Sequence, residues 1–474
     1  MRLRARAKRQ PGRWVWMLMA LLGSASARAA DTPLMVAEVL GSITNQYPPL
    51  LASLIERDIA AGRLQSARGA FDFNAFARLF STPAGYYERT TWDTGFEQFT
   101  GIWGSTIFGG YRVTLGDTLP DYDSSRTQGG GEPRIGVRVP LLRDGSIDRR
   151  RATLSKARLD QELAHPVIAR QRLDFVRAGT VAYFGWLAAG RRWMIAEELL
   201  RLANDRASAL TNQAQSGLIP RIVLTDNRRL IVARQIGVVQ ARRRFENAAI
   251  ALSLFHRRAD GEPSVAGRER IPGDFPEVVL PDSSTLVSEV VRGMDRRPEL
   301  RRLQLSREKL AVDLRLARNQ LRPQLDAGAT VSQDYGARTY KDKSELEVQA
   351  GIEFRMPLQR REARGRVTEV EGQLEQLARD EQFARERIRT EIHDAFSALS
   401  TAHEQIQQTR LNVELASELQ SAEEERFRRG AADLLALQLR ELAAFEARTL
   451  AVDAQADFFR AQADFRAASA AEAP

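Results

Sequence analysis

The chain has 474 residues, a formal net charge of +9 and no cysteine. The missing cysteines exclude disulfides, a thiolate metal site and lipidation at an N-terminal cysteine, so we expect a non-lipidated protein. Residues 1–29 carry seven basic and no acidic side chains, so the rest of the chain has a net charge of only +2. Such a small charge gives no argument for nucleic-acid binding.

Residues 1–29 have the pattern of a signal peptide. Arginine and lysine side chains come first, a short apolar run from Trp14 to Leu22 follows, and Ala27-Arg28-Ala29 offers a cleavage site. A membrane anchor is the weaker alternative, because the apolar run is well short of the roughly 18 residues that a spanning helix needs. The sequence therefore predicts export, with a mature chain that begins at Ala30.

A predicted helix over residues 33–68, with Pro48-Pro49 near a turn between two pieces, precedes a change of period. Within residues 71–142, apolar and polar side chains alternate in runs of up to about ten residues. Ile135 and Val137 alternate with Arg134 and Arg138, for example. Strands with one apolar and one polar face are typical of a transmembrane barrel, in which Arg138 would face the lumen.

Two long helical hairpins are predicted after the strand regions. The first covers residues 149–255 and breaks at Ser216-Gly217-Leu218. The second covers residues 366–471 and breaks at Arg429-Gly430-Ala431. A helix of about 60 residues spans roughly 90 Å. Helices of this length need partners along them, which favours coiled-coil packing.

The second half of the chain repeats the order of the first. A predicted helix over 286–321 leads into strands within 324–357, where Ile352 and Phe354 oppose Glu353 and Arg355, the other expected lumen-facing side chains. Gly217 and Gly430 stand 213 residues apart, and several further short matches follow in the same order. We interpret 30–256 and 286–474 as tandem repeats, joined by a proline-rich linker or equatorial region, 257–285.

The strands of one chain cannot close a barrel by themselves. Two hairpins give four strands, whereas roughly eight are the minimum. Oligomerisation would solve this problem, since three chains of four strands make twelve. The strand region of the first repeat is about twice as long as that of the second, which leaves room for an extra hairpin and a larger barrel.

These features together resemble the TolC-type outer-membrane efflux proteins (outer membrane factors). The resemblance covers nearly all of the mature chain and is carried by the two glycine turns and by paired motifs: Ala182-Tyr183 with Ala395-Phe396, and Val139-Pro140-Leu141 with Met356-Pro357-Leu358. It implies a mainly α fold with a transmembrane β region: a homotrimer whose twelve-stranded (or larger) barrel lies in the outer membrane lipid, above a periplasmic α-helical tunnel. Such a protein is a passive exit duct that docks onto a periplasmic adaptor (membrane fusion protein) and an inner-membrane pump.

The resemblance also implies where the sites lie. The adaptor-docking residues would be those of the hairpin tips: Ser216, Gly217, Leu218, Arg429, Gly430 and Ala431. The best-known members carry an acidic constriction six residues after each glycine, but here Val223 and Ala436 occupy those positions. Asp433 is best interpreted as the N-cap of the returning helix. The nearby charges of Arg221 and Asp433 are also the candidates for a periplasmic gate.

No motif in the sequence indicates enzymatic chemistry, a cofactor or a metal site. The nucleotide-binding and hydrolase signatures are absent, and His393 and His403 are ten residues apart, which is not a ligand spacing. Two alternatives to an efflux duct stay open. One is the exit duct of a type I protein-secretion system, which uses the same fold; the other is a secreted coiled-coil scaffold, which would leave the alternating strands unexplained.

Overall fold

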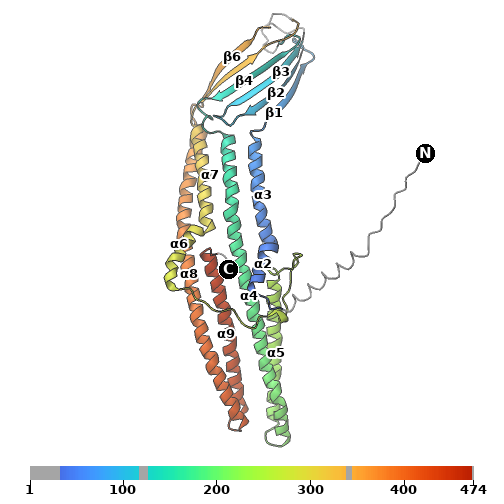
Figure 1. The fold of residues 1–474 in the computed structure, drawn as a ribbon, viewed down its shortest axis with the longest axis vertical. Coiled ribbons are helices and arrows are strands. Elements are labelled where there is room, and N and C mark those ends of the chain that lie inside the picture. The colour runs from blue at the N-terminus through green and yellow to red at the C-terminus, as the bar shows by residue number, and fades with distance from the viewer. Residues whose placement is uncertain (1–31, 117–125, 338–343, 472–474) are drawn as a thin grey trace, which may run out of the picture. The chain divides into compact units, whose positions relative to one another are not determined.

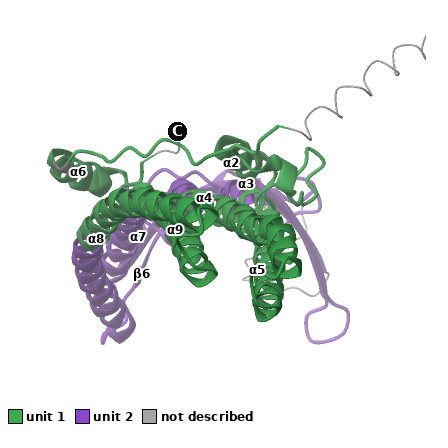
Figure 2. Ribbon diagram, turned by 90° about the horizontal axis from the view of Figure 1, so that it is seen from below, with its two compact units in different colours: residues 1–52, 171–296, 388–474 green, residues 53–170, 297–387 purple. Residues whose placement is uncertain are grey.

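The computed structural model describes residues 32–116, 126–337 and 344–471. The predicted signal peptide, 1–29, and much of the loop after residue 116 lie outside these ranges. The chain divides into two compact units (Figure 2). Unit 1 contains residues 32–52, 171–296 and 388–471, and unit 2 contains residues 53–170 and 297–387. Each unit takes segments from both halves of the chain, because the longest helices begin in unit 2 and end in unit 1.

Helices form most of the structure, and two of them are far longer than an ordinary globular helix (Figure 1). The helices are α2 (Val36–Gln46), α3 (Pro48–Gly69), α4 (Arg149–Gln215), α5 (Ile222–Leu252), α6 (Leu286–Arg296), α7 (Pro298–Gln320), α8 (Arg361–Arg428) and α9 (Leu434–Ala468). The long helices α4 and α8 have 67 and 68 residues. The expected mixture of long helices and two-faced strands is confirmed.

Proline sets the start of two helices. The predicted helix over 286–321 is two helices, α6 and α7, because Arg297 has extended backbone angles (φ −62°, ψ 120°) before Pro298. Pro298 then opens α7, where its missing N–H is not needed. Pro48 has the same role in the first repeat, following the extended Tyr47 (φ −77°, ψ 112°).

Unit 2 holds one antiparallel sheet in the simple order β1-β2-β3-β4-β5-β6. Its strands are β1 (Asn74–Thr82), β2 (Arg89–Phe99), β3 (Thr106–Leu115), β4 (Glu132–Pro140), β5 (Gln324–Ser332) and β6 (Glu347–Arg355). Among the described residues, the region before α4 therefore supplies four strands and the region between α7 and α8 supplies two. The expectation of four strands per chain, which led to twelve in a trimer, is corrected to six in the described sheet, because the region 71–142 contains the extra hairpin.

Aromatic side chains fill the core of unit 1. Trp186 and Phe458 are completely buried, and the rings of Phe184 and Phe459 stack with centroids 4.3 Å apart. The Tyr183 hydroxyl donates a hydrogen bond to the carbonyl oxygen of Leu34 at 2.8 Å. Burial raises the pKa of Tyr183 to about 12, so the hydroxyl keeps its proton for this bond. The motif residue Tyr183 and the nearby Trp186 are thus core residues.

Small side chains allow close helix packing in unit 2. Ala60 of α3 contacts Ala164 and Ile168 of α4 in one buried cluster. One turn further toward the sheet, Leu64, Ala67 and Ala157 form a second. Alanine at these positions lets α3 and α4 lie side by side, and both helices connect directly to strands of the sheet.

Candidate functional site

Both helical hairpins turn through the same hydrogen-bonded motif at the same end of unit 1 (Figure 1). Gly217 and Gly430 each have φ of 75°. At the second tip, the amide of Gly430 donates to the carbonyl of Phe427 at 3.0 Å and that of Ala431 donates to Arg426 at 2.8 Å. This is a Schellman motif, which needs a left-handed residue and so favours glycine. The first tip repeats it around Gly217.

The tips present apolar side chains to the outside. Leu218 is 76% exposed, and Ile222, Leu435 and Leu439 beside the turns are also mostly exposed. The other predicted docking residues, Ser216, Arg429 and Ala431, are exposed as well. Exposed apolar groups gathered around two turns form a surface that a partner protein could cover.

The two predicted gate residues have different surroundings. Asp433 caps α9, since its Oδ1 atom accepts a hydrogen bond from the Ala436 amide at 2.7 Å. Its carboxylate is thus committed to its own helix. Arg221 is exposed at the start of α5 and makes no ion pair with any residue that the structure describes. Nothing in unit 1 brings Arg221 and Asp433 into a hydrogen bond or ion pair among the described side chains.

A buried charge network, which sequence reasoning missed, joins the two hairpins instead. Glu441 of α9, with a side chain only 2% exposed, is bonded to Arg206 of α4 and to Arg234 of α5. One terminal nitrogen of Arg234 donates to the Glu441 carboxylate at 2.9 Å, and the other terminal nitrogen donates to the carbonyl oxygen of Leu199 at 3.0 Å. The two arginine side chains are 11% and 6% exposed, so all three charges lie inside the helix bundle.

Buried polar side chains extend this charge network toward the tips of the hairpins. Asn227 of α5 and Gln438 of α9 are buried, and each leaves one side-chain atom (Oδ1 and Nε2, respectively) without a hydrogen-bond partner among the described residues. The sequence contains one signal for the buried charge network. Leu437, Glu441 and Ala444 have the spacing of a single helix face, which places a carboxylate on an apolar stripe. The partners of Glu441, however, come from 207 and 235 residues away.

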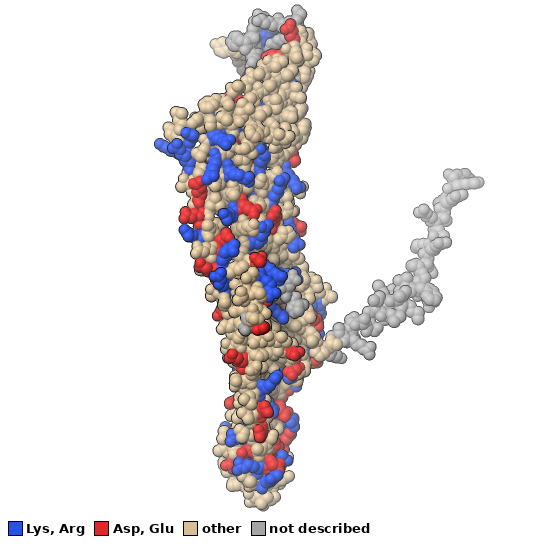
Figure 3. Space-filling model, turned by 60° about the vertical axis from the view of Figure 1, so that its left-hand side comes forward, with Lys and Arg blue, Asp and Glu red and all other residues tan. Residues whose placement is uncertain are grey.

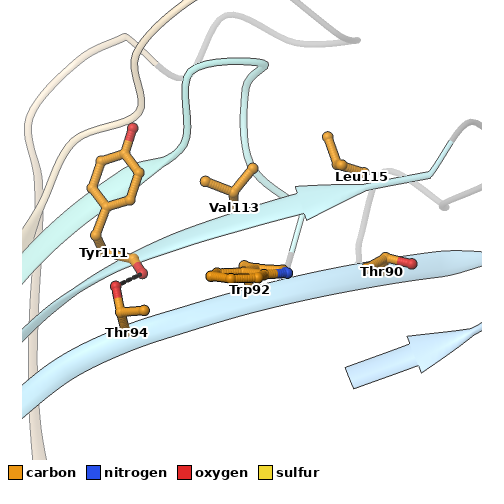
Figure 4. Close-up of a pocket in the computed structure, with 6 residues that line it drawn as sticks. All are labelled: Thr90, Trp92, Thr94, Tyr111, Val113 and Leu115. Carbon is orange, nitrogen blue, oxygen red and sulfur yellow. Dashed lines mark hydrogen bonds between the residues drawn. The ribbon is translucent and has the colours of Figure 1, made fainter. Parts of the chain in front are cut away.

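Cross-strand register gives the sheet two chemically different faces. Arg138, Glu353 and Arg355 lie on the same face, and Glu353 and Arg355 form an ion pair there. The opposite face carries an apolar set: Ala75, Ala77, Leu79, Trp92, Ile107, Val113, Ile135, Val137, Val331, Val348, Ile352 and Phe354. Figure 4 shows part of the apolar face, a shallow hollow of about 310 Å³ where Trp92 lies opposite Val113, with Tyr111 and Leu115 on either side of Val113.

The fold matches those of solved outer-membrane channels. The structure aligns with the outer-membrane channel OprN at a TM-score of 0.67 and 14% identity, over 92% of this chain and 90% of that one. The Neisseria gonorrhoeae MtrE outer-membrane channel gives 0.65 and 14% over 92% and 88%. The Campylobacter jejuni CmeC outer-membrane channel gives 0.63 and 12% over 92% and 85%. This is the fold of TolC-type outer-membrane channels. No protein-family model and no curated protein sequence matches the chain.

Within this channel fold, the described residues contain no helix long and apolar enough to cross a membrane. Nor do they contain a group of three or more side chains arranged to hold a metal ion. The expectation from the sequence that the chain resembles TolC-type channels is confirmed at the level of the fold.

A buried histidine anchors α2, the most N-terminal helix of the described residues. The Nδ1 atom of His256 lies 3.1 Å from the carbonyl oxygen of Ser264, and its Nε2 atom lies 3.1 Å from Oε1 of Glu38. Both oxygens are acceptors, so both contacts are hydrogen bonds only when the ring carries two protons. Arg270 donates to the other Glu38 oxygen at 2.8 Å. Glu38 thus connects α2 to the segment between the repeats.

This connection should depend on pH. Burial raises the pKa of Glu38, but hydrogen bonds from Arg270 and His256 outweigh it and hold the pKa below its ordinary 4.5. A depressed carboxyl pKa stabilises the fold above the unfolded pKa, and this stability is lost as pH falls through the folded value. We expect α2 to lose hydrogen-exchange protection below about pH 4.5. Glu38→Gln should abolish this step, whereas Asp58→Asn, on the exposed face of α3, should keep it; an unchanged step in Glu38→Gln would contradict the assignment.

Proposed function

We propose that this chain is the outer-membrane exit duct of a tripartite efflux system. It would pass small molecules, delivered by an inner-membrane pump through a periplasmic adaptor, passively out of the cell. The observation that carries the proposal is the sheet with one apolar and one charged face, attached to long helical hairpins. A sheet of this kind can face lipid on one side and water on the other.

The sheet would form part of a barrel wall in the outer membrane. Its apolar face would contact lipid, and Arg138, Glu353 and Arg355 would line the lumen. The open edges of the sheet support a homotrimer, because unpaired backbone groups are not tolerated in hydrocarbon. Neither catalysis nor a cofactor is required for such a duct.

The helical hairpins would form the periplasmic extension, and their tips would dock the adaptor. The exposed leucines beside Gly217 and Gly430 support this assignment, because the free energy falls when a partner covers apolar groups and removes them from water. Arg221, which is exposed and free of ion pairs with described residues, stays a candidate for closing contacts between copies. Asp433 would take part in such contacts only after its side chain releases the Ala436 amide.

Fractionation and export together test the proposal. The mature protein should remain with the outer membrane until detergent is added, and crosslinking in mild detergent should give a trimer. Cells that lack their own duct should expel a known pump substrate when this chain is supplied with its adaptor and pump. Recovery in the detergent-free soluble fraction, or as a monomer only, would overturn the proposal. Secretion of a protein in place of small-molecule efflux would assign the duct to a type I system.

Two neighbouring residues of β6 provide a test of the strand faces. Phe354→Arg should destabilise the inserted protein by up to about 1 kcal/mol, because it would place a charge on the lipid-facing side close to the bilayer edge, where Phe354 pairs with Leu325 at the start of β5. Arg355→Leu should have little effect, because that side chain belongs to the polar face. The measurement is the denaturant midpoint of the protein in bilayers. Equal tolerance of both changes would show that the faces are assigned wrongly.

A further inference from the structure

The hairpin β1–β2 is the extra hairpin of this chain, and it is bonded into the same sheet as the other strands. β2 and β3 pair over ten consecutive residues, Thr90–Phe99 against Thr106–Leu115. On the polar face, Arg134 of β4 reaches over β3 and donates to both carboxylate oxygens of Asp93 on β2, at 2.7 and 2.8 Å. The extra hairpin is therefore tied to the strands that follow it.

Side-chain shape holds the same strands in register. Three phenylalanines lie directly opposite glycines on the neighbouring strand, at three successive interfaces: Phe76 with Gly95, Phe96 with Gly109, and Phe108 with Gly136. A Cβ atom on these glycines would lie 2.5–2.8 Å from the opposing ring. Each ring thus occupies the space that only glycine leaves open, which fixes the pairing of β1 through β4.

The outer sides of β1 and β6 are the two edges of the sheet. Neither strand has a further partner among the described residues. Because the six strands alternate in direction, β1 and β6 run in opposite directions. Each also has one apolar face, with Leu79 on β1 and Ile352 on β6. The edge of one copy can therefore pair antiparallel with the opposite edge of the next, which keeps the apolar faces on one side.

We propose that β6 of one copy pairs with β1 of the next, so that three copies close a barrel of eighteen strands. This inference rests on the homotrimer of the proposed function. Barrel diameter grows roughly linearly with strand number, so the pore would be about 1.5 times as wide as that of a twelve-stranded barrel. The outer-membrane end of the duct thus admits broader cargo than a twelve-stranded exit.

Disulfide trapping tests the edge pairing, and the absence of native cysteines makes the chain suitable for it. Ile352→Cys is combined, one at a time, with cysteine at Ala75, Ala77 or Leu79 of β1, or at Ile107, Tyr111 or Val113 of β3. We expect linked dimers and trimers with β1 positions only. Links to β3 would mean that β1–β2 lies outside a twelve-stranded wall, which would overturn the proposal.

The control pair is Val137→Cys with Ala329→Cys, which are direct partners within one chain and should give an intrachain link. Intact-mass measurement of each sample tests the homotrimer separately from the pairing of β6 with β1. A monomer would contradict the proposed function itself. A trimer in which the control oxidises but Ile352→Cys links to neither strand would contradict the eighteen-stranded barrel alone.

A second feature of unit 2 is a groove lined with arginines where helices meet the sheet. It has a volume of about 540 Å³ and lies between the start of α4 and the end of α7. Its lining includes Arg151, Arg158, Arg315, Arg318 and Arg322, together with the apolar Ile147 and Leu154. Figure 3 shows Lys and Arg side chains gathered on the helices directly below the sheet.

The arginines of this groove differ in their ion pairs with the described residues. Arg151 is held by Asp148 at 2.6 Å, and Arg318 is held by Glu371 at 2.9 Å. Arg158, Arg315 and Arg322 are exposed and form no ion pair with any described residue. Like charges that share a groove repel one another, so an anion bound among them would be stabilised. Guanidinium groups suit phosphate in particular, because they donate in pairs.

We propose that the groove binds the headgroup of an anionic phospholipid. It lies within a few residues of the ends of β4 and β5, which would place it at the edge of the bilayer under the proposed function. The arginines would hold the phosphate, and Ile147 and Leu154 would contact the start of the acyl chains. A lipid bound here would seat the sheet at a fixed depth in the membrane.

Native mass spectrometry in detergent tests this site. Wild-type protein should retain phosphatidylglycerol at least about tenfold better than phosphatidylcholine, and the triple variant Arg158→Gln, Arg315→Gln, Arg322→Gln should lose the preference. The control triple, Arg228→Gln, Arg243→Gln, Arg244→Gln, removes three exposed charges of α5 and should keep it. Equal retention of both lipids by the wild type, or competition by equimolar glycerol phosphate, would overturn the lipid assignment.

Discussion

Replacing Glu441 by glutamine is expected to destabilise the helical hairpins of unit 1 by about 3–5 kcal/mol, because it leaves two arginines buried without a counter-charge. Glutamine keeps the size of the side chain, so packing loss contributes little. The Arg206 and Arg234 side chains would then have to break out of the bundle or draw water into it. Local opening of α5 and α9 should become correspondingly easier.

Hydrogen exchange measured on α5 and α9 gives this result directly, since 3 kcal/mol corresponds to a rate increase of roughly two orders of magnitude. Asp457→Asn is the matched control on the same helix. Asp457 pairs with Arg460 at 2.9 Å, but both side chains are about half exposed. Breaking such a surface pair changes stability by about 1 kcal/mol or less. Equal protection in the two variants would mean that the buried network does not hold the hairpins together.

Tryptophan at the hairpin glycines should abolish export while leaving assembly intact. A Cβ atom added at Gly217 or Gly430 would meet no other atom within 4 Å, so a side chain there extends into open space. The positive φ makes Gly430→Ala cost on the order of 1 kcal/mol. That is too little to unfold such long helices, whereas the indole of Gly430→Trp would stand in the proposed docking surface.

The measurement is trimer abundance in the outer membrane beside efflux of a known pump substrate. Gly261→Trp is the matched control, because Gly261 also has a positive φ (85°) and open space around it but lies between the repeats. This control should export normally. Full export with tryptophan at both tip glycines would show that the turns are only helix caps.

Much of the fold could be predicted because the relevant signals are local. Glycine at positions 217 and 430 marks turns, since positive φ is a property of single residues. The period of two in β6 separates Phe354 from Arg355 without reference to any other strand. Pro48 and Pro298 start helices because the ring restricts the residue before it, although the break between α6 and α7 was overlooked in the sequence.

The charged site could not be predicted in the same way. The sequence predicts Asp433 as the N-cap of the returning helix, which the structure confirms, and it makes Arg221 and Asp433 candidates for a gate because they are charged and near the glycines. The buried network that the structure shows is centred on Glu441, whose partners lie in α4 and α5. Nothing local identifies Arg206 and Arg234, which are two among many arginines in long charged helices. Only the packing of three helices removes them from water.

The sequence by itself determined the local elements of this protein: the long helices, their glycine turns and the two-faced strands. Each depends on residues within one or two turns of one another, where backbone sterics and periodicity act. Only the tertiary structure decided that six strands form one sheet and that Glu441 is buried between Arg206 and Arg234. Strand pairing and ion pairing join residues far apart in the chain, and their free energies depend on distances and burial that exist only after folding.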